Sequence, residues 1–225
     1  MYILNPIVIG TAHVVSNNVP VNDFAVWSVA TAYTAGQKVI YASQKIYRCI
    51  VNITGGSPPP ANTTNWADDG YVNAYKMIDA LSSSQTIYPS ITQTYDPGAR
   101  VGALAFINMA GTLLEITATN NGAEQIYNKT ISLDDSGVTS IYDWFFEPFV
   151  QKTDHFEIDF PESYVNPIIT ITMSNASGGN CKLGRFMIAK QYEVGYTQYG
   201  SAVGIRDYSV KTVDANNIAY LTKKD

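Results

Sequence analysis

The sequence predicts an all-β fold, an antiparallel β-sandwich of the jelly-roll type with a small inserted three-stranded aromatic module and one short helix. Strand-like segments recur from about residue 91 onward, separated by turn sequences such as Asp96-Pro97-Gly98 and Asn120-Asn121-Gly122. Two of these segments, 157–160 and 169–173, alternate polar and apolar residues with the period of two that a half-buried strand requires. Helical spacing of apolar residues is confined to residues 73–81.

The strands of the sandwich are expected at residues 100–108, 113–120, 125–133, 142–150, 155–160, 168–175, 181–192 and 201–212. Alternation in the segment around residue 157 places the acidic side chains Asp154, Glu157 and Asp159 on the solvent face.

Composition divides the chain into three parts. Residues 1–20 read as an extended arm whose strand joins a later sheet. Residues 21–70 form a small domain rich in tryptophan and tyrosine, with a triple proline at 58–60 that must lie in a loop. Residues 71–225 contain the short helix and the sandwich.

Composition also argues against several classes of function. The formal net charge is −5 without a basic stripe, so no nucleic acid is expected as a partner, and no apolar run is long enough for membrane insertion. The start of the chain lacks the pattern of a signal peptide, which favours a cytosolic place of synthesis. Cys49 and Cys181 are expected to be two separate reduced thiols.

No catalytic residue, metal ligand set or cofactor is predicted. Only His13 and His155 could partner a nucleophile, and a zinc site would consume every cysteine and histidine. Three carboxylate pairs, at 68–69, 134–135 and 157/159, could be read as the acid and base of a glycosidase. Residues 134–137 have instead a standard turn composition, and sequence neighbours in loops rarely present the required opposed geometry, although a calcium site in the acidic turns stays open. The chain is therefore expected not to be an enzyme.

Flat aromatic rings are the candidate sugar-binding groups. A pyranose packs its C–H face on a ring while neighbouring amides and hydroxyls bind its oxygens. The candidates are Trp27, Tyr33, Tyr47 and Trp66. Because so small a domain needs rings for its own core, each one is open to both interpretations; Tyr41 and Tyr47 favour the core, and Trp66, after the proline loop, favours the surface.

Residues 27–66 resemble the small chitin- and cellulose-binding modules of bacterial chitinases. The matching positions, in the order and rough spacing of those modules, are Trp27, Tyr33, Gly36, Val39, Tyr41, Tyr47, Pro58 and Trp66. Gln37-Lys38 departs from the pattern, which has an acidic residue after the glycine. The resemblance covers a fifth of the chain and implies carbohydrate binding through exposed rings.

The passage from Trp66 through Gly70, Asn73 and Met77 to Asp79 resembles bacteriophage tail proteins that carry such a module near the N-terminus. The segments 195–200 and 207–211 resemble the end of the same architecture. This resemblance implies a structural component of a phage tail (tip, baseplate or fibre-attachment region), made in the bacterial cytoplasm and resident in the virion. Its implied partners are other tail proteins and copies of itself, in a ring or trimer.

The aromatic segment 142–149 is the candidate assembly interface, through Tyr142, Trp144, Phe146 and Phe149. The alternative is a central strand of the sandwich covered on both faces. The leading expectation is thus a non-enzymatic tail component; the alternative is an adsorption protein whose 21–70 module binds host surface glycan.

Overall fold

The computed structural model describes residues 2–54, 56–79, 81–133, 140–146, 151–195, 210–213 and 219–222. The chain forms two compact units. One comprises residues 3–192, and the other comprises residues 1–2 together with 193–225. The second unit contains an antiparallel hairpin of β16 (Val210–Val213) and β17 (Ala219–Thr222).

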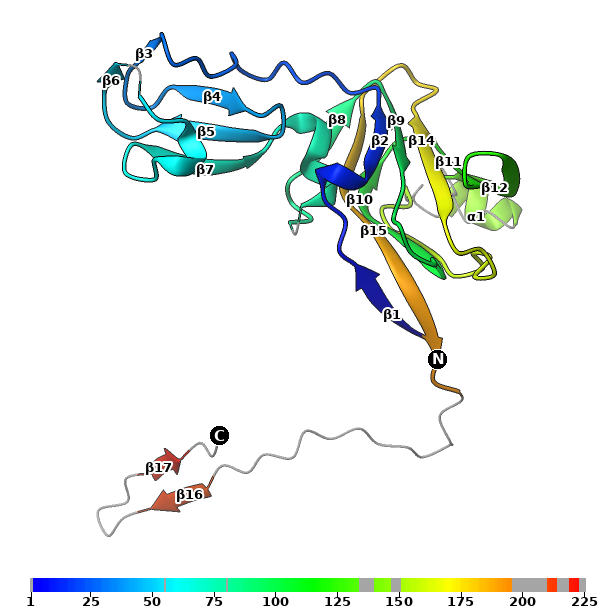
Figure 1. Cartoon of the computed structure of the whole chain (residues 1–225). Coiled ribbons are helices and arrows are strands. Elements are labelled where there is room, and N and C mark those ends of the chain that lie inside the picture. The colour runs from blue at the N-terminus through cyan, green and yellow to red at the C-terminus, as the bar shows by residue number, and fades with distance from the viewer. Residues whose placement is uncertain are drawn as a thin grey trace. The chain divides into compact units, whose positions relative to one another are not determined.

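Two five-stranded sheets form an antiparallel β-sandwich in the first unit, which confirms the predicted fold class (Figure 1). The first sheet has the order β1 (Tyr2–Ile7), β15 (Cys181–Glu193), β10 (Ala103–Ala110) and β13 (His155–Glu157), and β8 (Thr86–Tyr88) also pairs with β15. The second has the order β12 (Glu124–Ser132), β11 (Leu113–Asn120), β14 (Pro167–Ser174), β9 (Ser90–Tyr95) and β2 (Val14–Asn17).

The core lies between these sheets and follows the period of two. On β14, Ile169, Ile171 and Met173 are fully buried while the threonines between them are partly exposed. The first sheet contributes aromatic rings, and the centroids of Phe106 and Phe186 lie 5.0 Å apart. The sheets are therefore held by alternating apolar side chains, as the sequence pattern predicts.

Two strands of the sandwich, β8 and β9, were not predicted. β9 carries Gln93 at an inward position, where a polar residue hides the alternation. The Gln93 amide donates to the carbonyl of Ala74 and accepts a hydrogen bond from the Tyr95 hydroxyl, so its polar atoms are satisfied inside the core.

The strand predicted at 142–150 is wrong, because residues 141–146 form a short helix, α1 (Ile141–Phe146). Its aromatic residues are contiguous rather than alternating, and a helical turn brings the rings of Tyr142 and Phe146 to 4.7 Å. Most of the strand expected at 201–212, and the acidic turn at 134–137, lie outside the described residues.

Residues 21–70, called the small domain below, lie within the first compact unit and contribute to the expected three-stranded sheet, in the order β4 (Lys38–Tyr41), β5 (Lys45–Cys49) and β7 (Trp66–Tyr71). A second ladder joins β3 (Ala32–Tyr33) to β6 (Ile53–Thr54). The β4–β5 hairpin turns at Ala42 and Ser43, both with positive φ. The sequence-based hairpin at this place is confirmed.

Short 3-10 helices account for the remaining regular structure: η1 (Thr11–His13), η2 (Pro59–Ala61) and η3 (Asn73–Ile78). The helix predicted at 73–81 is thus a 3-10 helix, with Ala74 and Met77 buried. Cys49 and Cys181 are buried and are not joined in a disulfide. Among the described residues, no helix is both long and apolar enough to cross a membrane.

Candidate functional site

Three of the four candidate sugar-binding rings form the core of the small domain. Tyr33, Tyr47 and Trp66 are buried together with Val39 and Cys49. Tyr33 and Trp66 meet edge to face, with their centroids 5.2 Å apart. The interpretation of Trp66 as a surface ring is wrong: only 2% of it is exposed, because β7 places it beside Cys49 on the central strand β5.

Trp27 is the candidate ring that stays partly exposed. It meets the partly exposed Tyr41 edge to face at 5.8 Å, and Tyr41 in turn meets Tyr47 at 6.4 Å. These three rings, Tyr47, Tyr41 and Trp27, form a row that runs from the buried core to the surface. We call Trp27 and Tyr41 the aromatic face.

The backbone fixes the aromatic face. The Trp27 amide donates to the Ile40 carbonyl at 2.9 Å, and the Ile40 amide donates to the Ala25 carbonyl at 2.9 Å. One residue further on, the Ser28 amide donates to the Tyr33 hydroxyl at 2.7 Å. Sequence reasoning assigned Tyr41 to the core; its place at the last residue of β4, directly before the hairpin turn, is the signal that it lies at the edge of that core.

Charged side chains of the small domain form ion pairs with one another. Lys38 pairs with Asp69 at 2.5 Å, and Lys45 pairs with Asp68. The hydrogen bond to Asp68 raises the pKa of Lys45, despite the opposing effect of burial. Asp68 and Asp69 thus lie on β7, and each is paired with a lysine.

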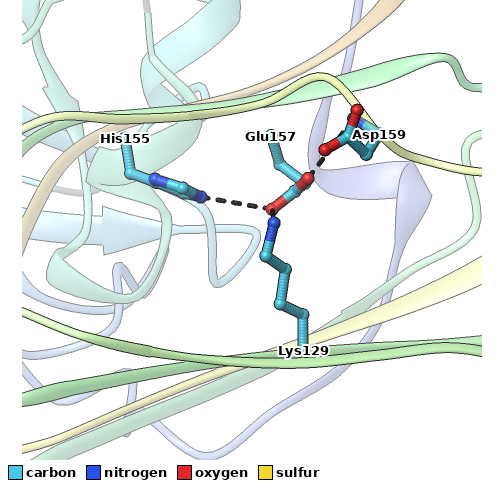
Figure 2. Close-up of polar contacts among 4 residues, drawn as sticks. All are labelled: Lys129, His155, Glu157 and Asp159. Atoms are coloured by element: carbon cyan, nitrogen blue, oxygen red, sulfur yellow. Dashed lines mark hydrogen bonds and ion pairs between the residues drawn. The ribbon is translucent and has the colours of Figure 1, made fainter.

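A buried charged cluster lies at one edge of the sandwich (Figure 2). The Glu157 carboxylate accepts from Lys129 Nζ at 2.8 Å, lies 3.3 Å from His155 Nε2, and accepts from the Asp159 amide at 3.3 Å. Lys129 comes from β12 and the other residues come from β13 or follow it, so the ion pair joins the edge strands of the two sheets.

The expectation that Glu157 faces solvent is wrong, since only 1% of it is exposed. In β13, the side chain of Phe156 points outward. Beyond the end of that strand, the apolar side chain of Phe160 is buried, and its ring lies 5.1 Å from that of Tyr127. A carboxylate so enclosed offers no surface to a substrate. We therefore assign the cluster to closing the edge of the sandwich.

The cluster shifts the pKa values of its members. Burial alone would raise the pKa of Glu157, but the hydrogen bonds from Lys129 and His155 outweigh it and hold that pKa below its ordinary value. Burial lowers the pKa of His155, and the hydrogen bond with Glu157 offsets only part of this effect. Both shifts favour the same state, with Glu157 ionised and His155 neutral.

Acid is expected to destabilise the sandwich through this cluster. Because the pKa of each group is lower in the folded state, the unfolded chain binds more protons than the folded one in acid. The stability of the fold therefore decreases as the pH drops below about 6.5, through His155, and decreases further as Glu157 is protonated. Urea unfolding at pH 7.5 and at pH 5.5 measures the loss. His155→Gln should reduce the difference; equal pH dependence in the wild type and in His155→Gln would contradict this role of His155.

The candidate assembly residues lie on or just beyond α1. Tyr142 and Phe146 are 69% and 70% exposed. The side chain of Trp144, and Phe149 as a whole, lie outside what the structure describes.

Among the described residues, no group of three or more potential metal ligands lies together.

Comparison with known proteins gives distant structural matches. No protein-family model matches the chain, and no curated protein matches it. A carbohydrate-binding module from Clostridium perfringens (CpGH89CBM32-6) matches with 14% identity and a TM-score of 0.34, over 52% of this chain and 83% of that one. A chitosan-binding module of a chitosanase/glucanase from Paenibacillus sp. IK-5 matches with 10% identity, the same TM-score and the same coverage. At these identities the similarity concerns the fold alone.

Proposed function

We propose that this chain is a non-enzymatic glycan-binding protein whose small domain, residues 21–70, holds a chitin-like or cell-wall polysaccharide of a host surface. The observation that carries the proposal is the aromatic face. Trp27 and Tyr41 pack against the buried aromatic core of the small domain, and both stay partly exposed, side by side.

Exposure of a tryptophan beside further apolar side chains has an energetic cost in water. Around Trp27, Phe24 is 40% exposed and Val26 is 67% exposed. A small domain gains stability by burying such groups, at roughly 25 cal/mol for each Å² of apolar surface. Several apolar side chains exposed together, rather than a single one, are typical of a binding surface.

The aromatic face suits the C–H face of a sugar ring. Its two rings are large, and backbone hydrogen bonds with β4 fix the main chain that carries the indole of Trp27.

Retention on insoluble chitin and on purified bacterial cell wall tests the proposal. Trp27→Ala and Tyr41→Ala should each weaken retention about tenfold or more, since aromatic residues at the centre of an interface contribute on the order of 1–2 kcal/mol. Tyr142→Ala removes an exposed tyrosine from α1, outside the small domain, and should leave retention unchanged. Equal retention by the wild type and the three variants would refute glycan binding by the aromatic face.

A second candidate function is assembly within a phage tail, and α1 is the observation that favours it. Ile141, Phe145 and Phe146 are 80%, 72% and 70% exposed, which gives a short apolar surface that this chain does not cover in its described part. In that case the protein would be made in the bacterial cytoplasm and reside in the virion, in contact with other tail proteins or copies of itself.

Light scattering of the purified protein separates the two functions. If α1 mediates self-assembly, the wild type should form a discrete oligomer, and Phe145→Asp should convert it to a monomer because a charge in an apolar contact is strongly unfavourable. Trp27→Ala should leave the oligomer intact. A wild-type monomer would remove self-assembly through α1.

A further inference from the structure

A depression in the sandwich has no part in the proposed function. It lies where the start of β10, the segment after β13 and the end of β15 meet, and is lined mainly by Arg100, Gly102, Glu162, Lys190, Gln191 and Tyr192. All of these residues belong to the first compact unit.

Hydrogen bonds hold the three segments in place. The Gly102 amide donates to the Ala189 carbonyl at 2.9 Å. The Gln191 amide group, in the orientation that satisfies both its ends, donates to the carbonyls of Ile158 and Gly102 at 2.8 and 3.0 Å. The buried ring of Phe160 anchors the segment that carries Glu162. These contacts fix the backbone around the depression, while the side chains of Arg100, Glu162, Lys190 and Tyr192 are exposed at its surface.

Glycine at position 102 is what lets Glu162 line the depression. A Cβ atom at Gly102 would lie 2.2 Å from Glu162 Oε1 and 2.9 Å from the Gln191 backbone nitrogen. The Glu162 carboxylate thus lies directly over the backbone of Gly102, a position that any larger residue would prevent.

The charged groups of the depression do not satisfy one another. Within the described part of the chain, Glu162 has no ion pair with Arg100 or Lys190, although all three line the same hollow. Opposite charges separated by a gap leave both acceptors and donors free for a ligand. Beside them, the Tyr192 ring is 52% exposed.

We propose that this depression is a second saccharide site, which binds one uncharged pyranose unit. Glu162 accepts hydrogen bonds from adjacent hydroxyls, Arg100 and Lys190 donate to hydroxyl oxygens, and Tyr192 packs on the C–H face of the ring. Because groups of both signs line the site, a neutral polyol that donates and accepts suits it better than a ligand of either charge.

The ligand class rests on the proposed glycan-binding function, but the site itself is independent of the aromatic face. Two sites on one chain would raise the affinity for a polymer through avidity, since the second contact becomes intramolecular once the first has formed.

The test uses the full chain with Trp27→Ala, so that failure of the aromatic face cannot affect the result. Chitohexaose and cellohexaose are titrated while the backbone amide signals of Gly102 and Tyr192 are followed by NMR. At least one saccharide should shift both signals saturably. Added Glu162→Gln or Tyr192→Ala should weaken that binding about tenfold, the effect of losing a charge-assisted hydrogen bond or a stacking ring.

Glu124→Gln is the matched control, because it neutralises an exposed carboxylate on β12 without touching the depression. It should leave binding unchanged. Unshifted Gly102 and Tyr192 signals with both saccharides, or equal weakening by Glu124→Gln and Glu162→Gln, would overturn the second site.

Discussion

Replacing Trp66 by alanine is expected to unfold the small domain. The indole lies at the centre of that domain's core, in contact with Tyr33, and truncating a buried tryptophan costs about 3–5 kcal/mol. A domain of this size has little stability to lose. Loss of dispersed amide signals from residues 21–70, with those of the sandwich retained, measures the effect by NMR.

Trp27→Ala is the matched control, since it removes the same side chain from the partly exposed end of the aromatic row. We expect it to keep the domain folded, because a partly exposed ring contributes much less to the core than a buried one. If both substitutions unfold the domain equally, Trp27 is a core residue and the aromatic face loses its basis.

Removing Lys129 is expected to destabilise the sandwich more than any other single charge substitution on it. Lys129→Met leaves the buried Glu157 carboxylate without its cation; because the Lys129 side chain is 42% exposed, we expect a cost of about 1–3 kcal/mol, below that of a fully buried pair. Part of the loss is relieved if Glu157 takes up a proton, so the destabilisation should shrink in acid. Urea unfolding at pH 7.5 measures it.

A double variant separates the ion pair from simple packing. Lys129→Met with Glu157→Leu removes both charges, and its stability should lie closer to the wild type than that of Lys129→Met alone. Lys182→Met removes an exposed lysine from β15 and should change stability by less than about 0.5 kcal/mol. A Lys129→Met protein as stable as Lys182→Met would show that Glu157 does not need its partner.

The sandwich was predictable because the alternation of polar and apolar residues along its strands can be read from the sequence. The alternation from Ile169 to Met173 reappears as the buried face of β14, and Asn121 and Gly122, both with positive φ, form the turn between β11 and β12. Strand β9 was not predicted because the polar Gln93 takes an inward position in it. Helix α1 was not predicted because a run of aromatic residues fits a strand as well as one helical turn.

The candidate sites were less predictable, because burial depends on which neighbours a strand acquires. Nothing local distinguishes Trp66 from Trp27; the pairing of β7 with β5 buries one, and the position outside the three-stranded sheet leaves the other partly exposed. Likewise, the inward turn of Glu157 depends on Lys129 from the opposite sheet, a contact that spans 28 residues (157 − 129) and that periodicity alone does not reveal.

The indole N–H signals of the protein provide the most direct test of the aromatic face. The chain has three tryptophans, which give three such signals in an NMR spectrum, and single Trp→Phe variants assign them. During titration with chitohexaose, we expect the Trp27 signal to shift saturably while the Trp66 signal stays in place. A Trp27 signal that does not move, or a shift confined to the other tryptophans, would contradict glycan binding by this face.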